Sequence, residues 1–591
     1  MLYPRLPIPG RGLDRALHLS NLTALVVLGT AILALSACGT EPTGAGGSGG
    51  AGGGGMGGEY RLVAANNLGM HCVDREYSIF SMLPPFNTLQ AQIIHAPQVG
   101  LPSVVEGGDL YLTFSPVADE KGAINSTSLG GKTDFWEHAP ALFGVSLPEG
   151  QGLLGLHMPA DAPEPGPQPF SYDDAAGAFL AAGIPITPID DAGSLNSYPL
   201  LRVTVMSKDG TQSLAALDVV APVSSETDCQ TCHATGQIAA ADDGIAWAND
   251  ADLEVQTKKN ILLLHDADQG TSLATQTPVL CASCHYDAAL DLAGAGPQGE
   301  QVDNPTFSKV MHGFHAKLED EGGSPLFPEN GSAAQTCYSC HPGAVTKCYR
   351  GAMASAGIQC SGCHGGMSAV GGDHPLAIGG SMDGTNDMEE RRPWVDLPRC
   401  QSCHTGDAVD RLEGAGTVPA SDGIHLMQGW LTGDPAASPI LATNKRFAEE
   451  ENRPYQTSKG HGGVLCQGCH NSTHAEWPNA DADANDNAAA SALQGHAGPI
   501  TECTACHAGG APLGLDGPHG MHPVADAGWI AEHGHMYEHS LSACEPCHGA
   551  DLEGTVLSRA AASRKLATEE GTVTFSKGQV IGCTHCHGKP D

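Results

Sequence analysis

The chain has 591 residues, enough for two to four domains, and 41% of them are hydrophobic although only 5% are aromatic. Its 77 glycines and 40 prolines favour loops over long regular elements. The formal net charge of -38, from 66 acidic and 28 basic residues, argues against nucleic acids as partners because a polyanion would be repelled. The same charge suits solubility outside the cell, or docking to a basic partner or a cationic mineral surface.

Residues 1–38 have the pattern of a bacterial export signal. Three arginines within the first 15 residues precede an apolar stretch over 22–35 that is too short to span a bilayer. The run Leu-Ser-Ala-Cys at its end resembles a bacterial lipobox, and by that resemblance Cys38 is the first mature residue and carries a lipid. A cleaved signal peptide with an incidental cysteine is the alternative. We expect an exported protein, lipid-anchored to the outer membrane on its periplasmic or cell-surface face, with no later transmembrane segment.

A glycine-rich tether over 39–58 follows this signal. The next region, 59–222, contains none of the Cys-x-x-Cys-His runs that recur later in the chain. Runs rich in β-branched and aromatic residues recur there at 60–63, 110–114 and 201–205, with turn residues between them. This pattern predicts a small β-rich, sandwich-like domain.

The phrase Asn-Asn-Leu-Gly-Met-His-Cys-Val-Asp at 66–74 is the distinctive stretch of this domain. His71 within it is either a ligand to a metal centre or a structural histidine in a tight turn. Cys72 and Cys348 form an even remainder of cysteines in an exported chain. We expect a disulfide between them that joins the β-rich domain to the rest, with two buried free thiols as the alternative.

The run Cys-x-x-Cys-His recurs nine times from residue 229 onward and accounts for 18 of the 21 cysteines. Its paired cysteines are Cys229 and Cys232, Cys281 and Cys284, Cys337 and Cys340, Cys360 and Cys363, Cys400 and Cys403, Cys466 and Cys469, Cys503 and Cys506, Cys544 and Cys547, and Cys583 and Cys586. The histidines that follow are His233, His285, His341, His364, His404, His470, His507, His548 and His587.

This spacing is the attachment signal for haem c. The two thiols add to the vinyl groups of the porphyrin, and the histidine after the second cysteine is placed to bind the iron. A lone copy would suit half of a zinc site or a redox dithiol equally well, but zinc sites pair two Cys-x-x-Cys runs and need no histidine after each. Because all nine copies carry the histidine, we predict nine haems with the motif histidines as proximal ligands.

From Cys229 to His587 the chain resembles a multihaem c-type cytochrome, of the kind that bacteria use to move electrons through the periplasm or out to the cell surface. The resemblance covers about three-fifths of the chain. It implies covalent haem c, mostly six-coordinate iron, and haems close enough for electrons to hop between them. The fold is then dominated by haem, with short helices and much loop, and is preceded by the small β-rich domain.

Motif spacing divides the haem region. Five motifs lie within 223–410 and four within 456–591, and the gap between them, 411–455, is expected to be a connecting loop. One continuous chain of haems with an inserted loop is the alternative. The third and fourth motifs are so close in sequence that their haems should be neighbours in space. Short helices should carry the motifs, and a longer helix is expected over 523–539.

The second axial ligand decides whether an iron is closed or open. Histidine there gives a low-potential electron carrier, methionine raises the potential, and an empty or water-filled face binds substrate. With 28 histidines the chain holds more than nine irons need. The distal candidates are His265, His312, His315, His374, His425, His461, His474, His496, His519, His522, His535 and His539. Methionines near them are expected to pack around porphyrin.

Two other constellations carry weaker signals. Oxygen-bearing side chains alternate over 481–487 and partly match a calcium loop, but the glycine and closing glutamate of an EF-hand are missing, so a solvated acidic loop is the default. Arg391 and Arg392 precede the fifth motif and suit either contacts to haem propionates or a surface turn.

These patterns favour an electron carrier over an enzyme, with redox partner proteins or an extracellular acceptor as partners. A multihaem oxidoreductase acting on a small nitrogen or sulfur oxyanion at an open haem is the first alternative. Such families often mark the catalytic haem by a departure from the motif, and none of the nine motifs departs. A filament-forming or surface-binding cytochrome that self-assembles through the β-rich domain is the second alternative.

Overall fold

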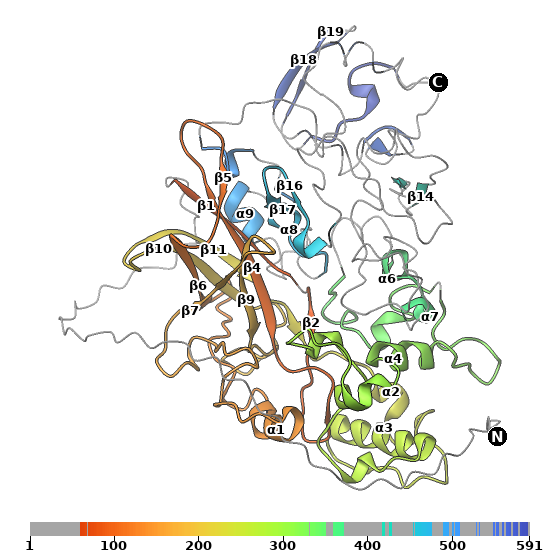
Figure 1. Ribbon diagram of the computed structural model, residues 1–591. Coiled ribbons are helices and arrows are strands. Elements are labelled where there is room, and N and C mark those ends of the chain that lie inside the picture. Colours follow the sequence, from red (N-terminus) through yellow and green to blue (C-terminus); the bar gives the residue numbers. More distant parts are fainter. Residues whose placement is uncertain are drawn as a thin grey trace, which may run out of the picture. The chain divides into compact units, whose positions relative to one another are not determined.

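The computed structural model describes residues 59–370, apart from 68, 330 and 350–358, and shorter stretches further along the chain (Figure 1). These stretches are 417–419, 425–427, 453, 455–474, 488–495, 499–500, 503–508, and short runs and single residues between 528 and 588. The export signal, the tether, the fifth motif, the loop 481–487 and the arginine pair before the fifth motif lie outside the described residues.

Two antiparallel sheets form the strand-rich region between residues 60 and 220 (Figure 1). The first has the order β1–β4–β9–β8, with β5 paired to β4; the strands are β1 Tyr60–Asn66, β4 Asn87–His95, β5 Ser103–Val105, β8 Ser171–Asp173 and β9 Ala178–Ile184. The second has the order β11–β10–β6–β7; the strands are β6 Leu110–Val117, β7 Gln168–Pro169, β10 Leu200–Ser207 and β11 Ser213–Val220. The three predicted β-rich runs fall within β1, β6 and β10.

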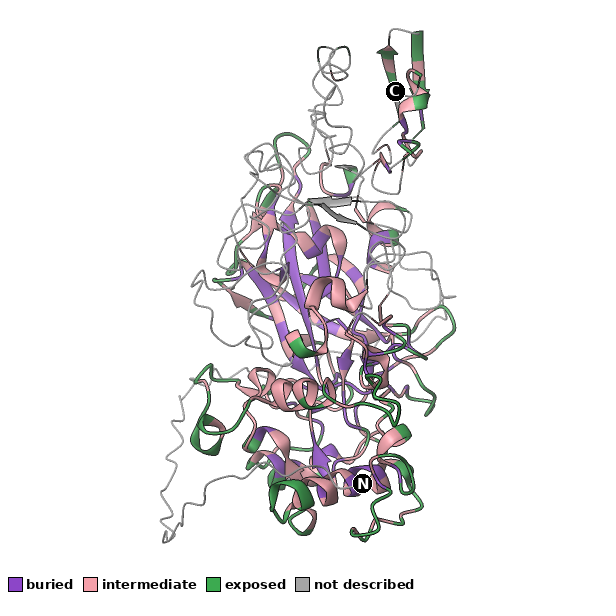
Figure 2. Ribbon diagram, turned by 90° about the vertical axis from the view of Figure 1, so that its right-hand side faces the viewer, coloured by how far each residue is buried: buried purple, intermediate pink, exposed green. Residues whose placement is uncertain are grey.

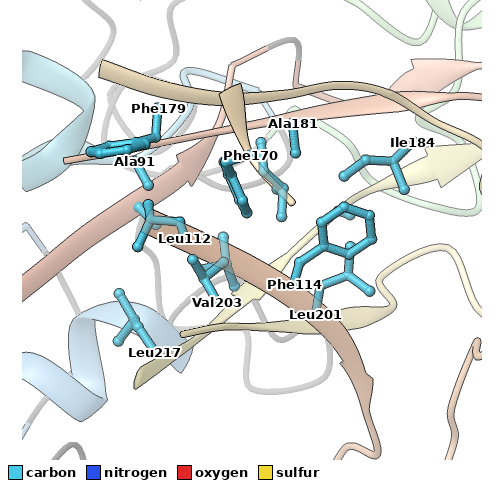
Figure 3. Close-up of a cluster of buried hydrophobic side chains, with 14 of the residues drawn as sticks. Ala91, Leu112, Phe114, Phe170, Phe179, Ala181, Ile184, Leu201, Val203 and Leu217 are labelled. Carbon is cyan, nitrogen blue, oxygen red and sulfur yellow. The ribbon is translucent and has the colours of Figure 1, made fainter. Parts of the chain in front are cut away.

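The two sheets enclose one hydrophobic core (Figure 3). Alternate side chains of a strand point to the same face, so Leu89, Ala91 and Ile93 of β4 all face this core. Phe114 of β6 and Leu201 of β10 approach from the second sheet and are fully buried. Burying these apolar side chains between facing sheets is the main stabilisation available to such an arrangement.

The opposite face of the first sheet is also covered, which is why β1 and β4 are buried along almost their whole length (Figure 2). The covering segment comprises η8 Tyr455–Thr457, β16 Lys459–Gly460, β17 Val464–Leu465 and α8 Cys466–His470. Gln90 and Gln92 of β4 bond to it: the Gln467 amide donates to Gln90, and the Leu465 N–H donates to Gln92 Oε1 over 2.8 Å. The sixth motif is therefore built on the strand-rich region.

Short ladders tie the remaining described segments together. Two are parallel: β2 His71–Cys72 with β12 Val223–Ser224, and β3 Phe80–Ser81 with β13 Val279–Leu280. The others are hairpins: β14 Thr417–Pro419 with β15 His425–Met427, β16 with β17, and β18 Arg564–Thr568 with β19 Gly571–Phe575. The two parallel ladders attach the loop after β1 to the residues that precede the first and second motifs.

Helices are mostly short. The α-helices are α1 Phe135–Phe143, α2 Gln230–His233, α3 Leu253–Gln269, α4 Phe307–His315, α6 Cys360–His364, α7 Met367–Val370, α8 and α9 Ala488–Gln494. The 3-10 turns are η1 Leu273–Thr275, η2 Cys281–Ser283, η3 Ala288–Leu290, η4 Gly299–Val302, η5 Cys337–Ser339, η8, η10 Cys503–Ala505 and η14 Cys583–His585. Among the described residues, none of these helices has the length and apolar character to cross a membrane.

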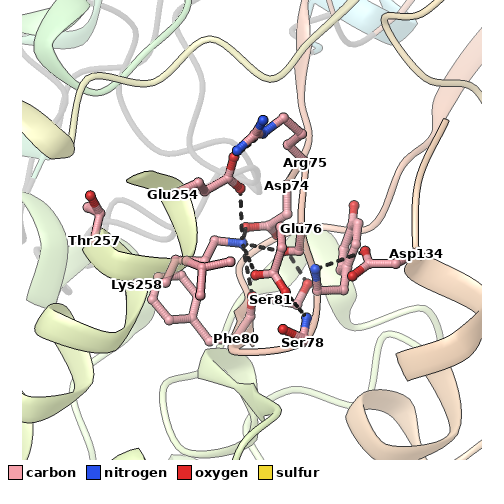
Figure 4. A network of polar contacts seen from close by, with 12 residues as sticks. Asp74, Arg75, Glu76, Ser78, Phe80, Ser81, Asp134, Glu254, Thr257 and Lys258 are labelled. Carbon is pink, nitrogen blue, oxygen red and sulfur yellow. Dashed lines mark hydrogen bonds and ion pairs between the residues drawn. The ribbon is translucent and has the colours of Figure 1, made fainter. Parts of the chain in front are cut away.

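A buried ion pair fixes α3 to the loop after β2 (Figure 4). Lys258 Nζ lies 3.0 Å from Asp74 Oδ1 and also donates to the carbonyl oxygens of Glu76 and Phe80. The second oxygen of Asp74 accepts from the N–H groups of Met82 and Leu83. Both charges are thus removed from water but hydrogen-bonded on all sides, which is the condition for a buried pair to persist.

Candidate metal centres

Each motif whose fold is described forms about one helical turn. The amide of the motif histidine donates to the carbonyl of the first cysteine, over 2.8 Å for His233, 3.1 Å for His285 and 2.9 Å for His341. Residues three and four apart on a helical turn lie on the same side. The two thiols and the imidazole of a motif therefore share one side of the turn, and the prediction that short helices carry the motifs is confirmed for the described copies.

Six motif histidines lie close to a second histidine from elsewhere in the chain. The ring centroids are 6.4 Å apart for His233 and His315, 6.4 Å for His285 and His265, 5.9 Å for His341 and His312, 5.9 Å for His364 and His474, 6.0 Å for His507 and His461, and 5.7 Å for His587 and His533. Two imidazoles that bind one metal ion from opposite sides, through bonds of about 2 Å, have centroids roughly 6 Å apart.

The ring planes of these pairs do not share an orientation. The angle between them runs from 13° for His312 and His341 to 72° for His265 and His285. Two ligands of one metal ion can each rotate about the bond axis, but aromatic rings that pack offset or edge to face span the same separations, roughly 4.5–7 Å. What connects these pairs to a metal centre is that one ring of each pair belongs to a Cys-x-x-Cys-His motif.

Hydrogen bonds leave the outer nitrogen of several of these rings available. The Nδ1 atom faces a backbone carbonyl in His285 with Pro305 (2.9 Å), His312 with Ser308 (2.9 Å), His315 with Met311 (2.6 Å) and His587 with Gly588 (2.6 Å). A carbonyl oxygen only accepts, so Nδ1 carries the proton and Nε2 keeps its lone pair. This arrangement of a metal-binding histidine fixes both the tautomer and the ring orientation.

Burial favours the neutral form of several of the paired rings. Burial, with the nearby charge of His315, lowers the pKa of His233 to about 4. Burial likewise lowers the pKa of His341, and burial together with His341 lowers that of His474. The neutral imidazole is the form that binds metal, so these sites need no deprotonation before ligation.

The described residues fit a haem at six motifs. A porphyrin supplies four nitrogen ligands of its own, so an iron within it needs two axial ligands from the protein. Each pair would offer two imidazoles to such an iron, and one member of every pair lies on a turn that belongs to a Cys-x-x-Cys-His motif. Among the described residues, no three histidine, cysteine or acidic side chains gather around a single position.

Helix α4 serves two motifs at once. His312 and His315 are three residues apart on it, and they pair with His341 of the third motif and His233 of the first. The helix begins after Thr306, whose hydroxyl accepts from the Lys309 N–H. This capped helix of nine residues therefore places a second histidine beside each of two motif histidines.

Several motifs lie side by side. The thiols of Cys337 and Cys360, from the third and fourth motifs, are hydrogen-bonded to one another. The pKa of Cys340 is raised to about 12 by burial and by the nearby thiols of Cys229 and Cys232, so the first motif lies beside the third. In the sixth and seventh motifs, burial and the Cys506 thiol act on Cys469 in the same way.

The eighth and ninth motifs are joined through the backbone. The Cys583 N–H donates to the Leu552 carbonyl over 2.8 Å, and His548 bonds to Ile581. His533 lies near both motifs, since its charge lowers the pKa of His548 and its ring is the partner of His587.

The structure accounts for the distal candidates unevenly. His265, His312, His315, His461 and His474 each lie beside a motif histidine, while only the backbone of His425 is described, in β15. His374, His496, His519, His522, His535 and His539 lie outside the described residues. His533 was missed by sequence reasoning, although it stands two residues before a chosen candidate, and that His-Gly-His spacing was the signal available.

His71 has a structural role. Its ring lies 3.9 Å from that of Phe86, and Nε2 is 3.3 Å from the Pro84 carbonyl. It is fully enclosed, and burial lowers its pKa to about 4. Of the two interpretations offered by the sequence, the structural histidine is the one that these contacts support.

The expected disulfide between Cys72 and Cys348 is not formed. The Cys348 thiol donates to the Pro342 carbonyl over 2.9 Å. Burial, reinforced by the charges of Asp74 and Glu226, raises the pKa of Cys72 to about 12, so this thiol stays protonated and unreactive. The parity argument failed because buried cysteines also serve as small apolar side chains.

No protein-family model matches this chain, and neither the search of curated proteins nor that of solved structures finds a significant match. The candidate centres therefore rest on the geometry above and on the motif.

Proposed function

We propose that this protein is an electron carrier that holds nine haem c groups, most of them with two histidine ligands. It passes electrons through the cell envelope or to an extracellular acceptor. The observation that supports this most strongly is the set of six histidine pairs, each of which takes one member from a different Cys-x-x-Cys-His motif.

In this proposal the cysteines of each motif hold a haem through thioether bonds and the motif histidine binds its iron. The second ligands of six irons would be His315, His265, His312, His474, His461 and His533. Bound haem would supply one-electron redox chemistry. With two histidines on each of those irons no position would remain for a substrate, which favours transfer over catalysis.

The contacts between motifs support transfer within the chain. The first, third and fourth motifs adjoin one another, as do the sixth and seventh and the eighth and ninth. Haems attached at adjoining motifs would be close enough for electrons to hop. The excess of acidic residues suits a basic redox partner, and a lipid at Cys38 would keep the chain at the outer membrane.

The test is a reductive titration of the full-length protein, made in a host that attaches haem c. We expect nine electrons per chain, reoxidation by a soluble ferric acceptor, and no turnover of nitrite or sulfite. The paired substitution Cys229→Ser and Cys232→Ser should reduce the count to eight. Turnover of either oxyanion would replace this proposal with the reductase.

A further inference from the structure

The phrase at 66–74 has no role in the proposed function, yet its glycine is placed where a side chain is not tolerated. Gly69 follows the end of β1 and has φ +78°, in the left-handed region that favours glycine. Its N–H donates to the side-chain oxygen of Asn66, whose amide in turn donates to the side chain of Asn87. The turn is thus held rigidly against the first sheet.

His474 packs directly on this turn. A Cβ atom added at Gly69 would lie 2.8 Å from His474 Cβ and 3.3 Å from both its Nδ1 and its carbonyl oxygen. Contacts below 3.0 Å force a shift, so any residue other than glycine must displace His474. The nearest atoms do not include Nε2, the nitrogen that would bind iron.

The segment that carries His474 is docked on the same turn and sheet by independent contacts. Gln456 donates to the Asn67 carbonyl over 2.8 Å, and the Leu465 N–H donates to Gln92 of β4. At Gly468 an added Cβ would lie 3.1 Å from Val63 of β1. The ring of His474 lies beside that of His364 of the fourth motif, with centroids 5.9 Å apart.

We propose that the Gly69 turn is a positioning element that sets the imidazole of His474 opposite His364. The strand-rich region thereby closes the iron of the fourth motif. This inference rests on the proposed function, because His474 acts as a ligand only where the fourth motif holds a haem.

The experiment compares three variants of the full-length holoprotein by carbon monoxide titration of the reduced form. Gly69→Ala should bind one carbon monoxide per chain more than the wild type, with one further haem turning high-spin and the haem count unchanged. Gly130→Ala is the matched control: Gly130 has φ +77° and no atom within 4 Å of an added Cβ, so it carries the same backbone strain without the contact. It should bind no more than the wild type.

His474→Ala should also bind one carbon monoxide more than the wild type, and the double variant Gly69→Ala/His474→Ala should still bind only one more because both changes open the same iron. Two more than the wild type in the double variant would overturn the inference, as would a Gly69→Ala protein that binds no more than Gly130→Ala does. Absence of haem from the wild type would instead overturn the proposed function, and this inference with it.

Discussion

His71 makes the strand-rich region sensitive to acid. Its pKa is about 4 in the folded chain and near 6.5 when unfolded. Above pH 6.5 the His71 imidazole is neutral in both the folded and the unfolded chain. Between pH 6.5 and pH 4 it is protonated in the unfolded chain but not in the folded one. The stability contributed by His71 is therefore present above pH 6.5 and lost as the pH falls toward 4, by about 3 kcal/mol.

Urea unfolding at pH 7 and pH 4.5 tests this for the wild type and His71→Gln. Carboxylates contribute to acid sensitivity in both proteins, so the difference between their pH dependences isolates His71. The wild type should lose about 2 kcal/mol more than the variant between these two pH values, because part of the full loss falls below pH 4.5. Equal losses would mean that His71 is protonated or solvated in the folded chain.

For each candidate centre, the sequence predicts one of the two histidines. The proximal histidine follows from a spacing of a few residues, as at Cys229 and His233. Its partner His315 stands far along the chain, and only the fold brings the two rings together. The number of histidines and their sequence neighbours therefore suggest candidate partners but do not show which motif histidine each one pairs with. His533 was left out of the candidates for this reason.

Among the elements, α3 depends on one buried charge. Burial raises the pKa of Asp74, whereas Lys258 acts to lower it; for Lys258, burial acts to lower the pKa, but the carboxylates of Asp74 and Glu254 raise it above its usual value. Lys258→Met would leave a buried carboxylate without its partner. We expect the free energy of unfolding to fall by about 3–5 kcal/mol.

The neighbouring residue provides the control. Lys259 pairs with Asp250 at 2.9 Å, but both side chains are partly exposed. Lys259→Met should cost less than about 1 kcal/mol in chemical denaturation, because solvent screens such a pair. Adding Asp74→Asn to Lys258→Met should recover part of the loss. Similar losses for the two lysine variants would contradict the buried pair.

Helix α4 yields a stoichiometric prediction. His312→Ala and His315→Ala should each allow one carbon monoxide to bind per reduced chain, and the double variant should allow two, because the histidines pair with different motifs. Phe314→Ala, on the same helix but half-exposed, should allow none. A single variant that opened both irons would show that α4 unfolds when either ligand is lost.

Element types were predictable where the signal was local, and their burial was not. In β4 the apolar Leu89 and Ala91 alternate with Gln90 and Gln92, a pattern typical of a strand with one face in the core and one in solvent. The same alternation would place Gln90 and Gln92 in solvent, yet both are buried, because the segment 460–468 covers them from more than 360 residues away. No periodicity encodes that contact, and the paired amide hydrogen bonds become visible only in the folded chain.

At the scale of the molecule, the strand-rich region and the motif region are interlocked. β12 and β13 pair with short strands of the loop after β1, and the sixth motif packs on the first sheet. The predicted division at 222 thus separates strands from motifs in sequence but not in packing. We therefore expect the strand-rich region to be more protected from hydrogen exchange in the holoprotein than in protein made without haem attachment.

The most direct test of the central claim is a haem count of the purified full-length protein, followed by carbon monoxide added to the reduced form. We expect nine haems per chain, of which at least six do not bind carbon monoxide because paired histidines would close their irons. Carbon monoxide binding to more than three haems would contradict this pairing and favour the oxidoreductase. If protein from a host able to attach haem carried none, the proposed function would be contradicted, and the motifs would be better explained as zinc sites.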